Sequence, residues 1–257
     1  MPEGSISFDR AARYYDRTRR VSPQLLRAMV DLLRAEAPPR GLALEVGTGT
    51  GTLSLPLHRK GSRVVGLDLS LEMLRQVRAK GEPGPPLVGG DAMLLPFRNG
   101  TFDLVFARHV LHLVGEWRTA AGEMARVAAR GGRILVTGGC YAGAYDELIE
   151  VFTREAGRAR PLPGLLPSEE PLLDEWMRSL GARVRVLDLG SEPPDETLRE
   201  FLAAIDANLF SWTWPLGERD RERAAAATRR WAEERYGDLD RPIPAQLRVI
   251  WRAYDLP

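Results

Sequence analysis

Short apolar runs alternate with amphipathic segments along the first half of the chain. Runs such as 42–46 (LALEV) and 102–107 (FDLVFA) are apolar enough for buried strands. The predicted strands cover residues 42–46, 63–68, 86–90, 102–107 and 133–137, and the predicted helices cover 22–36, 51–60, 71–80 and 117–130. Strands that alternate with helices favour an α/β fold, in which a doubly wound, mainly parallel sheet carries helices on both faces.

Capping residues mark two of these helices. Ser22 can cap the first helix, and Pro23 stands where its missing N–H does no harm. Ser70 can cap the helix over 71–80, which Gly81 then ends. These local signals agree with the boundaries that the apolar pattern predicts.

The second half of the chain is less regular. Helices are predicted at 145–157, at 169–180 after Ser168, and at 195–237 with interruptions at Pro215 and Gly217; strands are predicted at 183–189 and 246–253, and a proline-rich loop at 161–167. We expect a single domain over residues 1–257. Segments 141–167 and 191–243 are expected to be insertions that form a cap over the open edge of the sheet.

Composition limits the classes of protein to which the chain can belong. With 257 residues and 44% hydrophobic content, it can bury the core of one large domain. A formal net charge of +1 gives no general attraction to nucleic acid or to an anionic membrane. The single cysteine, Cys140, excludes an intramolecular disulfide and a multi-cysteine metal site. We find neither a signal peptide nor an apolar run of about 18 residues, so we expect a cytoplasmic protein.

A glycine cluster follows the first predicted strand. Residues 45–51 read Glu-Val-Gly-Thr-Gly-Thr-Gly, and glycines here let bare main chain approach a ligand. The third glycine of a dinucleotide fingerprint would fall on Thr52, which disfavours a pyrophosphate ligand. No Gly-Lys-Ser/Thr follows, so a phosphate-binding P-loop is absent as well. Taken alone, the cluster is a weak signal, because a tight strand-to-helix turn without a ligand can have the same sequence.

Two aspartates follow the next two predicted strands. Asp68 ends the second strand, where doubly wound folds place an acid whose two oxygens can accept from both ribose hydroxyls. Asp91 stands at the tip of the third strand, where it can accept from the exocyclic amine of adenine. Each could instead be an ordinary turn or loop aspartate, although Ser70 already serves as the cap after Asp68. The order of glycine loop, ribose acid and adenine acid is more specific than any one of them.

Four runs carry a family resemblance, and they are LALEVGTGTGTLSLPL, VVGLDLS, GGDAMLLPFRNGTFDLVFARHVLHLV and EMARVAARGGRILV. Together they resemble the class I S-adenosylmethionine-dependent methyltransferases, and within them the group that includes the ubiquinone- and menaquinone-biosynthesis enzymes. The resemblance covers about residues 8–138. It implies a Rossmann-like fold with a seven-stranded sheet whose last strand is antiparallel, and a cofactor-binding core over residues 40–140.

The resemblance also implies a set of residues that bind S-adenosylmethionine. They are Tyr15, Arg19, Glu45, Gly47, Thr48, Gly49, Asp68, Leu69, Asp91, Ala92, Met93 and Arg108. Residues 45–49 would border the methionine end of the cofactor, and Asp68 would bind the ribose hydroxyls. Residues 91–93, together with Leu69, would surround the adenine. Arg108 would lie near the sulfonium.

The amino-terminal segment 1–36 resembles the lid with which many of these enzymes cover the cofactor. Arg19 could pair with the cofactor carboxylate, because a planar guanidinium matches a carboxylate. Arg17 and Arg20 are alternatives, since they lie close by in the sequence. One departure from the family pattern is Arg130, which replaces the proline of the usual Pro-Gly-Gly before the fifth strand.

A catalytic base is needed only when the attacking atom keeps a proton of high pKa. The sulfonium methyl is already electrophilic, so alignment of the acceptor and exclusion of water supply most of the acceleration, and we expect no metal. The histidines are His58, His109 and His112. His112 is our candidate base; a structural position in the short helix HVLHLV is the alternative. His58, beside Arg59 and Lys60, is expected to be a solvated or capping residue.

Residues in the predicted insertions allow two interpretations. Phe210, Trp212 and Trp214 could line an apolar acceptor pocket, or they could anchor the insertion to the core. Cys140 stands where acceptors often bind, but we favour its role as a small buried apolar residue. The run 218–236 mixes both charge signs and is expected to be a solvated helix.

Three functions therefore remain open. The first is methyl transfer to a small-molecule acceptor, with S-adenosylhomocysteine as product. The second is methylation of a macromolecule, which the near-neutral charge disfavours, as does Ala-Arg-His-Val at 107–110 in place of an Asn-Pro-Pro-Tyr type of motif. The third is a cofactor-binding protein without transferase activity. We expect no nucleic-acid or membrane partner, and the oligomeric state stays open.

Overall fold

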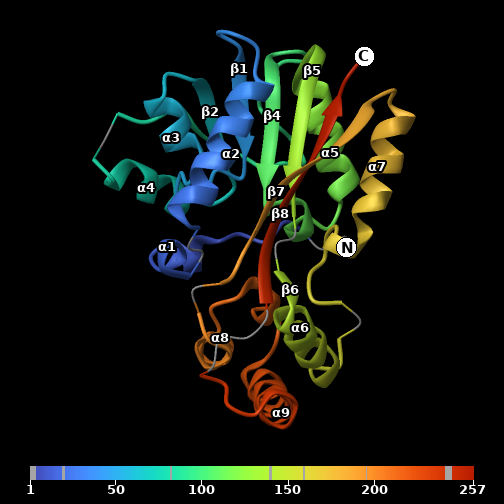
Figure 1. Cartoon of the computed structure of the whole chain (residues 1–257). Helices are drawn as coiled ribbons and strands as arrows, with labels where there is room; N and C mark the ends of the chain where they lie inside the picture. Colours follow the sequence, from blue (N-terminus) through green and yellow to red (C-terminus); the bar gives the residue numbers. More distant parts are fainter. Residues whose placement is uncertain are drawn as a thin grey trace. The chain divides into compact units, whose positions relative to one another are not determined.

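A computed structural model describes residues 4–18, 21–81, 83–138, 141–158, 160–194, 196–240 and 245–257 (Figure 1). The chain divides into two compact units. Unit 1 contains Met1–Gly139, Gly164–Leu189 and Ile250–Pro257, and unit 2 contains Cys140–Pro163 and Gly190–Val249. Unit 2 thus includes most of the two segments that the sequence predicts as insertions. Their role as a cap over the sheet stays a prediction.

The sheet has the strand order β3-β2-β1-β4-β5-β8-β6, and β7 pairs with β8. The strands are β1 (Leu42–Val46), β2 (Arg63–Asp68), β3 (Leu87–Gly89), β4 (Phe102–Arg108), β5 (Ala128–Thr137), β6 (Tyr141–Gly143), β7 (Arg183–Glu192) and β8 (Ala245–Asp255). Strands β1 to β5 pair in parallel, whereas β8 runs antiparallel to β5. The predicted seven-stranded sheet with its antiparallel last strand is confirmed. The short β6, which the sequence pattern did not predict, adds a further strand.

Helices cover both faces of the sheet in unit 1. The helices there are α1 (Tyr15–Thr18), α2 (Pro23–Glu36), α3 (Ser54–Arg59), α4 (Leu71–Ala79), α5 (Trp117–Val127) and α7 (Glu170–Ser179). One face of the sheet, which includes Leu44, Val105 and Ile134, packs in a single apolar cluster with residues of α5 and α7. Figure 1 shows α2 in front of β1. No described helix is long and apolar enough to cross a membrane.

Capping signals located two helix starts, whereas other helix boundaries differ from the predicted ones. The side chains of Ser22 and Ser70 accept hydrogen bonds from Leu25 N and Met73 N, as capping predicts. Helix α5 was predicted to run to residue 130 but ends at Val127, because Ala128 already pairs with β4 in the sheet. Helix α3 begins at Ser54 instead of residue 51, because the glycine loop occupies the first predicted turn. Ser168 lies within a 3-10 turn, and α7 begins at Glu170.

Unit 2 has an aromatic core of its own. Its helices are α6 (Ala144–Glu155), α8 (Leu198–Asp206) and α9 (Glu218–Tyr236). The rings of Phe210 and Trp212 stack at 5.3 Å, and Trp212 meets Phe152 edge-on at 4.9 Å. Phe201 lies 4.6 Å from Tyr145, and all five of these side chains are buried. The aromatic residues 210 and 212 therefore take part in the packing inside unit 2, and both predicted roles, lining a pocket or anchoring the insertion to the core, stay predictions.

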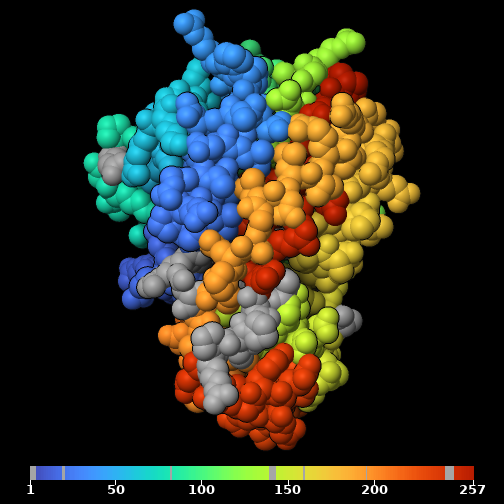
Figure 2. Space-filling model, in the orientation of Figure 1, coloured from blue at the N-terminus to red at the C-terminus, as the bar shows by residue number. Residues whose placement is uncertain are grey.

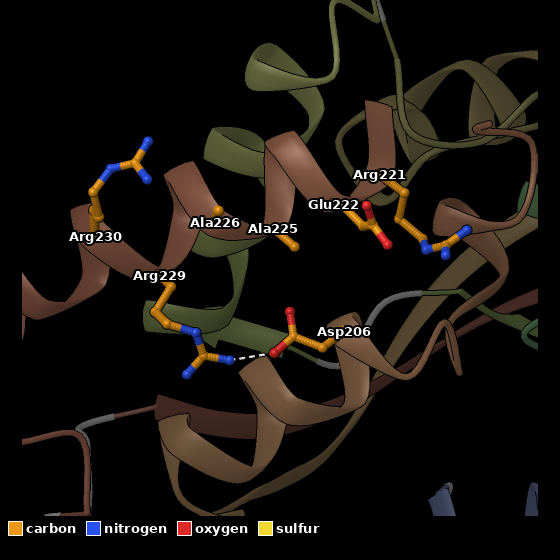
Figure 3. Close-up of a pocket in the computed structure, with 7 residues that line it drawn as sticks. All are labelled: Asp206, Arg221, Glu222, Ala225, Ala226, Arg229 and Arg230. Carbon is orange, nitrogen blue, oxygen red and sulfur yellow. Dashed lines mark hydrogen bonds and ion pairs between the residues drawn. The ribbon is translucent and has the colours of Figure 1, made fainter. Parts of the chain in front are cut away.

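Helix α9 presents many charged side chains to solvent, as the sequence predicts. Figure 2 shows this helix, in orange-red, at the surface of unit 2. A groove beside it is lined by Ala225, Ala226 and charged side chains, which include Asp206 and Arg229 (Figure 3). The Arg229 guanidinium donates to Asp206 of α8 across this groove. The groove is thus part of the packing between α8 and α9.

Arg185 of β7 joins α2 to β8 in unit 1. Its guanidinium donates to both oxygens of Glu36, at 2.9 and 2.7 Å, and to both oxygens of Asp255, at 2.9 and 2.8 Å. The hydrogen bonds from Arg185 lower the pKa values of Glu36 and Asp255 below their usual range. A carboxyl group with a lowered pKa stabilises the fold at neutral pH, and this contribution is lost as the pH falls through the folded-state pKa.

We expect Arg185→Met to lower the free energy of unfolding at pH 7 by about 2–4 kcal/mol, because two partly buried carboxylates lose their hydrogen bonds to Arg185. They keep the longer ion pairs with Arg133, at 3.5 Å for Glu36 and 3.4 Å for Asp255. Urea unfolding would measure the change. Lys60→Met is the matched control, since the Lys60–Asp31 ion pair is 40% and 61% exposed, and its loss should cost less than about 1 kcal/mol. Equal losses for the two variants would contradict a special role for Arg185.

Candidate functional site

The carboxyl ends of β1, β2, β3 and β4 meet at one edge of the sheet. The strand order reverses between β1 and β4, because β2 and β3 lie on one side of β1 and β4 and β5 on the other. Ligands of doubly wound sheets bind outside the strand ends at such a reversal. The glycine loop and both sequence-predicted aspartates follow strands at this edge, so the structure brings them together.

The glycine loop turns through left-handed backbone. Gly47, Gly49 and Gly51 have φ of 72°, 56° and 84°, a region that side chains rarely allow. A Cβ on Gly47 would lie 2.3 Å from Val110 Cγ2, and one on Gly49 would lie 3.9 Å from the ring of Tyr15. Glycine at 47 is thus required both by the turn and by the close approach of the segment that follows β4.

Asp68 links the glycine loop to the start of α4. Its Oδ2 accepts from Gly49 N at 2.7 Å, and its Oδ1 accepts from Ser70 N at 2.8 Å. Burial raises the pKa of Asp68, which these two backbone bonds partly offset. A carboxylate offers about four acceptor positions, so each oxygen can accept one bond more. This capacity at the crevice fits the vicinal hydroxyls of a ribose.

The loop after β3 lies directly beside the end of β2. Gly90 N donates to Asp68 O at 3.0 Å, and Asp91 Oδ1 accepts from Met93 N at 2.9 Å. Ala92 is buried, whereas Leu69 on the neighbouring loop is 38% exposed. The residues predicted to surround an adenine are therefore close together, with an apolar side chain and a carboxylate among them.

The amino-terminal segment crosses these loops. Ser5 Oγ donates to Asp91, Ile6 N donates to Leu113 O, Ser70 Oγ donates to Asp9, and Lys80 Nζ pairs with Asp16. Tyr15 contacts Phe8 edge-on at 5.9 Å and lies over the glycine loop. The roles of Ser5 and Asp9 were missed, because nothing local in the sequence marks these contacts. Arg19, Arg20 and Cys140 lie outside the described residues.

Glu45 is buried beneath the glycine loop. Thr48 Oγ1 donates to Glu45 Oε2 at 2.7 Å and also lies 2.7 Å from Ser54 Oγ. Burial raises the pKa of Glu45 to about 7, although the two hydroxyl residues and the charge of Arg108 oppose the rise. The carboxyl group therefore fixes the shape of the loop from below. Its expected position beside the methionine end of the cofactor stays a prediction.

The segment after β4 contains a strained histidine. His109 has a φ of 56°, which is uncommon outside glycine, and strain of this kind gathers at functional sites. Its backbone N donates to Thr137 O at 2.8 Å, and its Nδ1 lies 3.2 Å from Gly138 O. The His112 ring is 6.0 Å away in a 3-10 turn, where His112 O accepts from Gly164 N. The sequence placed both histidines near β4 but not this backbone conformation.

His58 lies apart from these residues, in the last turn of α3, and its role as a solvated or capping residue stays a prediction. Within the described ranges, no group of three His, Cys, Asp or Glu side chains could bind a metal ion.

The raised pKa of Glu45 predicts a pH-dependent stability. An acid whose pKa rises on folding destabilises the folded state once it ionises, so stability should fall as the pH rises from about 4.5 to 7. The shift from 4.5 to about 7 corresponds to about 3 kcal/mol. Glu45→Gln should remove this slope in urea unfolding between pH 5 and 8. The exposed Glu175→Gln is the control, and an unchanged slope in Glu45→Gln would contradict the assignment.

Comparison with known proteins identifies the family. Residues 44–136 match the model of the family described as "Methyltransferase domain". A demethylmenaquinone methyltransferase from Renibacterium salmoninarum is 34% identical over 174 residues, which cover 66% of this chain and 72% of that protein. One from Streptomyces avermitilis is 44% identical over 101 residues, which cover 39% of this chain and 43% of that protein. The chain thus spans less than half of the second relative.

A solved structure shows the same fold. The magnesium protoporphyrin IX methyltransferase of Synechocystis, solved with bound S-adenosylhomocysteine, superposes with a TM-score of 0.55 at 20% identity, covering 71% of this chain and 90% of that one. The family model matches the segment that carries the glycine loop, Asp68 and Asp91. The chain therefore belongs to the class I S-adenosylmethionine-dependent methyltransferases, in the group that includes the enzymes of menaquinone biosynthesis.

Proposed function

We propose that this protein transfers the methyl group of S-adenosylmethionine to a small-molecule acceptor and releases S-adenosylhomocysteine. The proposal rests on one observation. The bare glycine loop, Asp68 and Asp91 lie close together at the ends of three neighbouring strands. The names of the relatives, which methylate demethylmenaquinone, support a small acceptor.

The proposed cofactor site assigns one task to each strand end. Asp68 accepts from the ribose hydroxyls with its remaining acceptor capacity. Asp91 accepts from the adenine amine, Ala92 N donates to the ring, and Leu69 and Met93 pack beside it. Residues 45–49, with Thr48 as their buried anchor, border the methionine end, and Arg108 lies near the sulfonium. Tyr15 covers the site from the amino-terminal segment, and Arg19 pairs with the carboxylate of the cofactor.

In this mechanism the main task of the chain is to position the acceptor against the cofactor. When bound, the cofactor supplies a methyl group that is already electrophilic. The chain aligns the acceptor with the bond that breaks and excludes water, and such orientation can supply several kcal/mol of the barrier. The contacts of Ser5, Asp9 and Tyr15 fix the amino-terminal segment over the loops, which suits the exclusion of water. His112 accepts a proton only where the attacking atom retains one.

Calorimetric titration tests the cofactor directly. We expect micromolar binding of S-adenosylmethionine, which is about −8 kcal/mol, and no comparable binding of NADH. Asp68→Ala should weaken the affinity about 30-fold or more, because charge-assisted hydrogen bonds to the ribose are lost. Asp31→Ala, an exposed acid on α2, should leave the affinity unchanged.

Because Asp68 also fixes the glycine loop, a second comparison isolates the ribose contact. The 2′-deoxy analogue of S-adenosylhomocysteine should bind the wild type more weakly than S-adenosylhomocysteine does. Asp68→Ala, in contrast, should bind the two compounds with equal affinity. An equal penalty in both proteins would remove Asp68 from the ribose.

His112→Ala should leave S-adenosylhomocysteine binding within about two-fold, a change below ~0.5 kcal/mol. The reason is that His112 lies on the β4 side, away from the loops after β2 and β3. Calorimetry would measure the affinity. A loss of ten-fold or more would show that His112 belongs to the cofactor site and not to the acceptor side.

A further inference from the structure

The guanidinium of Arg108 has no partner among the described residues. Arg108 is the last residue of β4 and is half-buried. Other half-buried arginines of unit 1 bind carboxylates: Arg126 binds Glu123, and Arg252 binds Glu170 and Asp174. No described side chain or carbonyl forms a hydrogen bond or ion pair with Arg108. Partial burial of a cation costs hydration free energy, and this cost is not offset unless an anion lies nearby. A ligand can supply that anion.

The acids near Arg108 are already engaged elsewhere. Glu45 pairs across the sheet with Phe106, so Arg108, two residues further along β4, lies on the same face. The charge of Arg108 reaches Glu45, but the Glu45 carboxyl group binds Thr48 and Ser54. The Asp68 oxygens likewise accept from backbone N–H groups.

The residues that follow Arg108 add no negative charge. His109 and His112 come next, with their rings 6.0 Å apart, and the residues between them are Val110 and Leu111. The Cα partner of Arg108 on β5 is Thr137, whose hydroxyl is neutral. The end of β4 is therefore an electropositive position beside the glycine loop. Guanidinium groups bind carboxylate and phosphate oxygens in pairs, with defined geometry.

The position of Arg108 favours the acceptor over the cofactor as the source of the anion. The proposed adenosine contacts lie after β2 and β3, on one side of β1, whereas Arg108 ends β4 on the other side. In-line transfer places the acceptor beyond the methyl group, away from the adenosine. The end of β4 and its neighbour β5 border that space.

We propose that Arg108 binds an oxyanion of the methyl acceptor, so that the acceptor of this enzyme is a small molecule that carries a carboxylate or phosphate group. This inference rests on the proposed methyl transfer. Arg108 fixes the acceptor's charged end, which positions its attacking atom against the methyl group. A neutral analogue would leave the guanidinium unpaired and would be rejected.

The test uses the full chain saturated with S-adenosylhomocysteine, titrated with malonate, inorganic phosphate or neutral malonamide. We expect malonate or phosphate to bind and malonamide not to bind; the tighter of the two anions identifies the group. Arg108→Gln should weaken that binding about 10- to 100-fold, as expected for loss of a paired, charge-assisted contact, and Arg108→Lys less. Arg98→Gln is the control, because exposed Arg98 precedes the opposite end of β4 and should change nothing.

Three results would overturn the inference. The first is that neither anion binds the wild-type complex. The second is that Arg98→Gln and Arg108→Gln weaken binding equally. The third is that Arg108→Gln weakens S-adenosylhomocysteine at least ten-fold but not 5′-methylthioadenosine, which lacks the carboxylate; Arg108 would then bind the cofactor. If the wild type bound no S-adenosylhomocysteine at all, the proposed function itself would fail, which calorimetry detects before any anion is added.

Discussion

The hydrogen bonds that converge on the end of β2 hold the site together. Leu67 O accepts from Gly47 N and Thr48 N, the Asp68 carboxylate accepts from Gly49 N and Ser70 N, and Asp68 O accepts from Gly90 N. Two consecutive residues thus connect the loops after β1, β2 and β3. Because the same carboxylate retains acceptor capacity, the group that shapes the crevice is also the group best placed to bind a ligand in it.

Sequence patterns predicted the features that depend on neighbouring residues. Strands β1 to β5, the caps at Ser22 and Ser70, and the order of glycine loop and aspartates all follow from local rules. The predicted end of α5, at residue 130, was wrong, because the pairing of Ala128 with Phe102 overrides helix propensity. The left-handed backbone of His109 and the contacts of Ser5 and Asp9 arise from residues far away in the sequence. The packing of Trp212 against Phe152 likewise joins residues that are far apart in the sequence.

Two arginines of unit 1 have different roles, one in stability and one in the proposed binding of a ligand. Arg185 is hydrogen-bonded to Glu36 and Asp255, so its charge stabilises the packing of α2, β7 and β8 against one another. Arg108 stands at the functional edge of the sheet with no such pairing among the described residues. A chain that neutralises its structural cations internally can leave one for a ligand, and local sequence does not distinguish the two cases.

The position of β8 determines when the sheet of unit 1 can be completed. β8 lies between β5 and β7, and Ile134 on β5 pairs with Tyr254 on β8. During synthesis, one edge of β5 therefore stays open until the segments of unit 2 and β7 have emerged. Long-range pairing of this kind slows folding and exposes strand edges to wrong partners. An independent aromatic core in unit 2, able to form early, would shorten the effective loop between β5 and β8 and so favour correct closure.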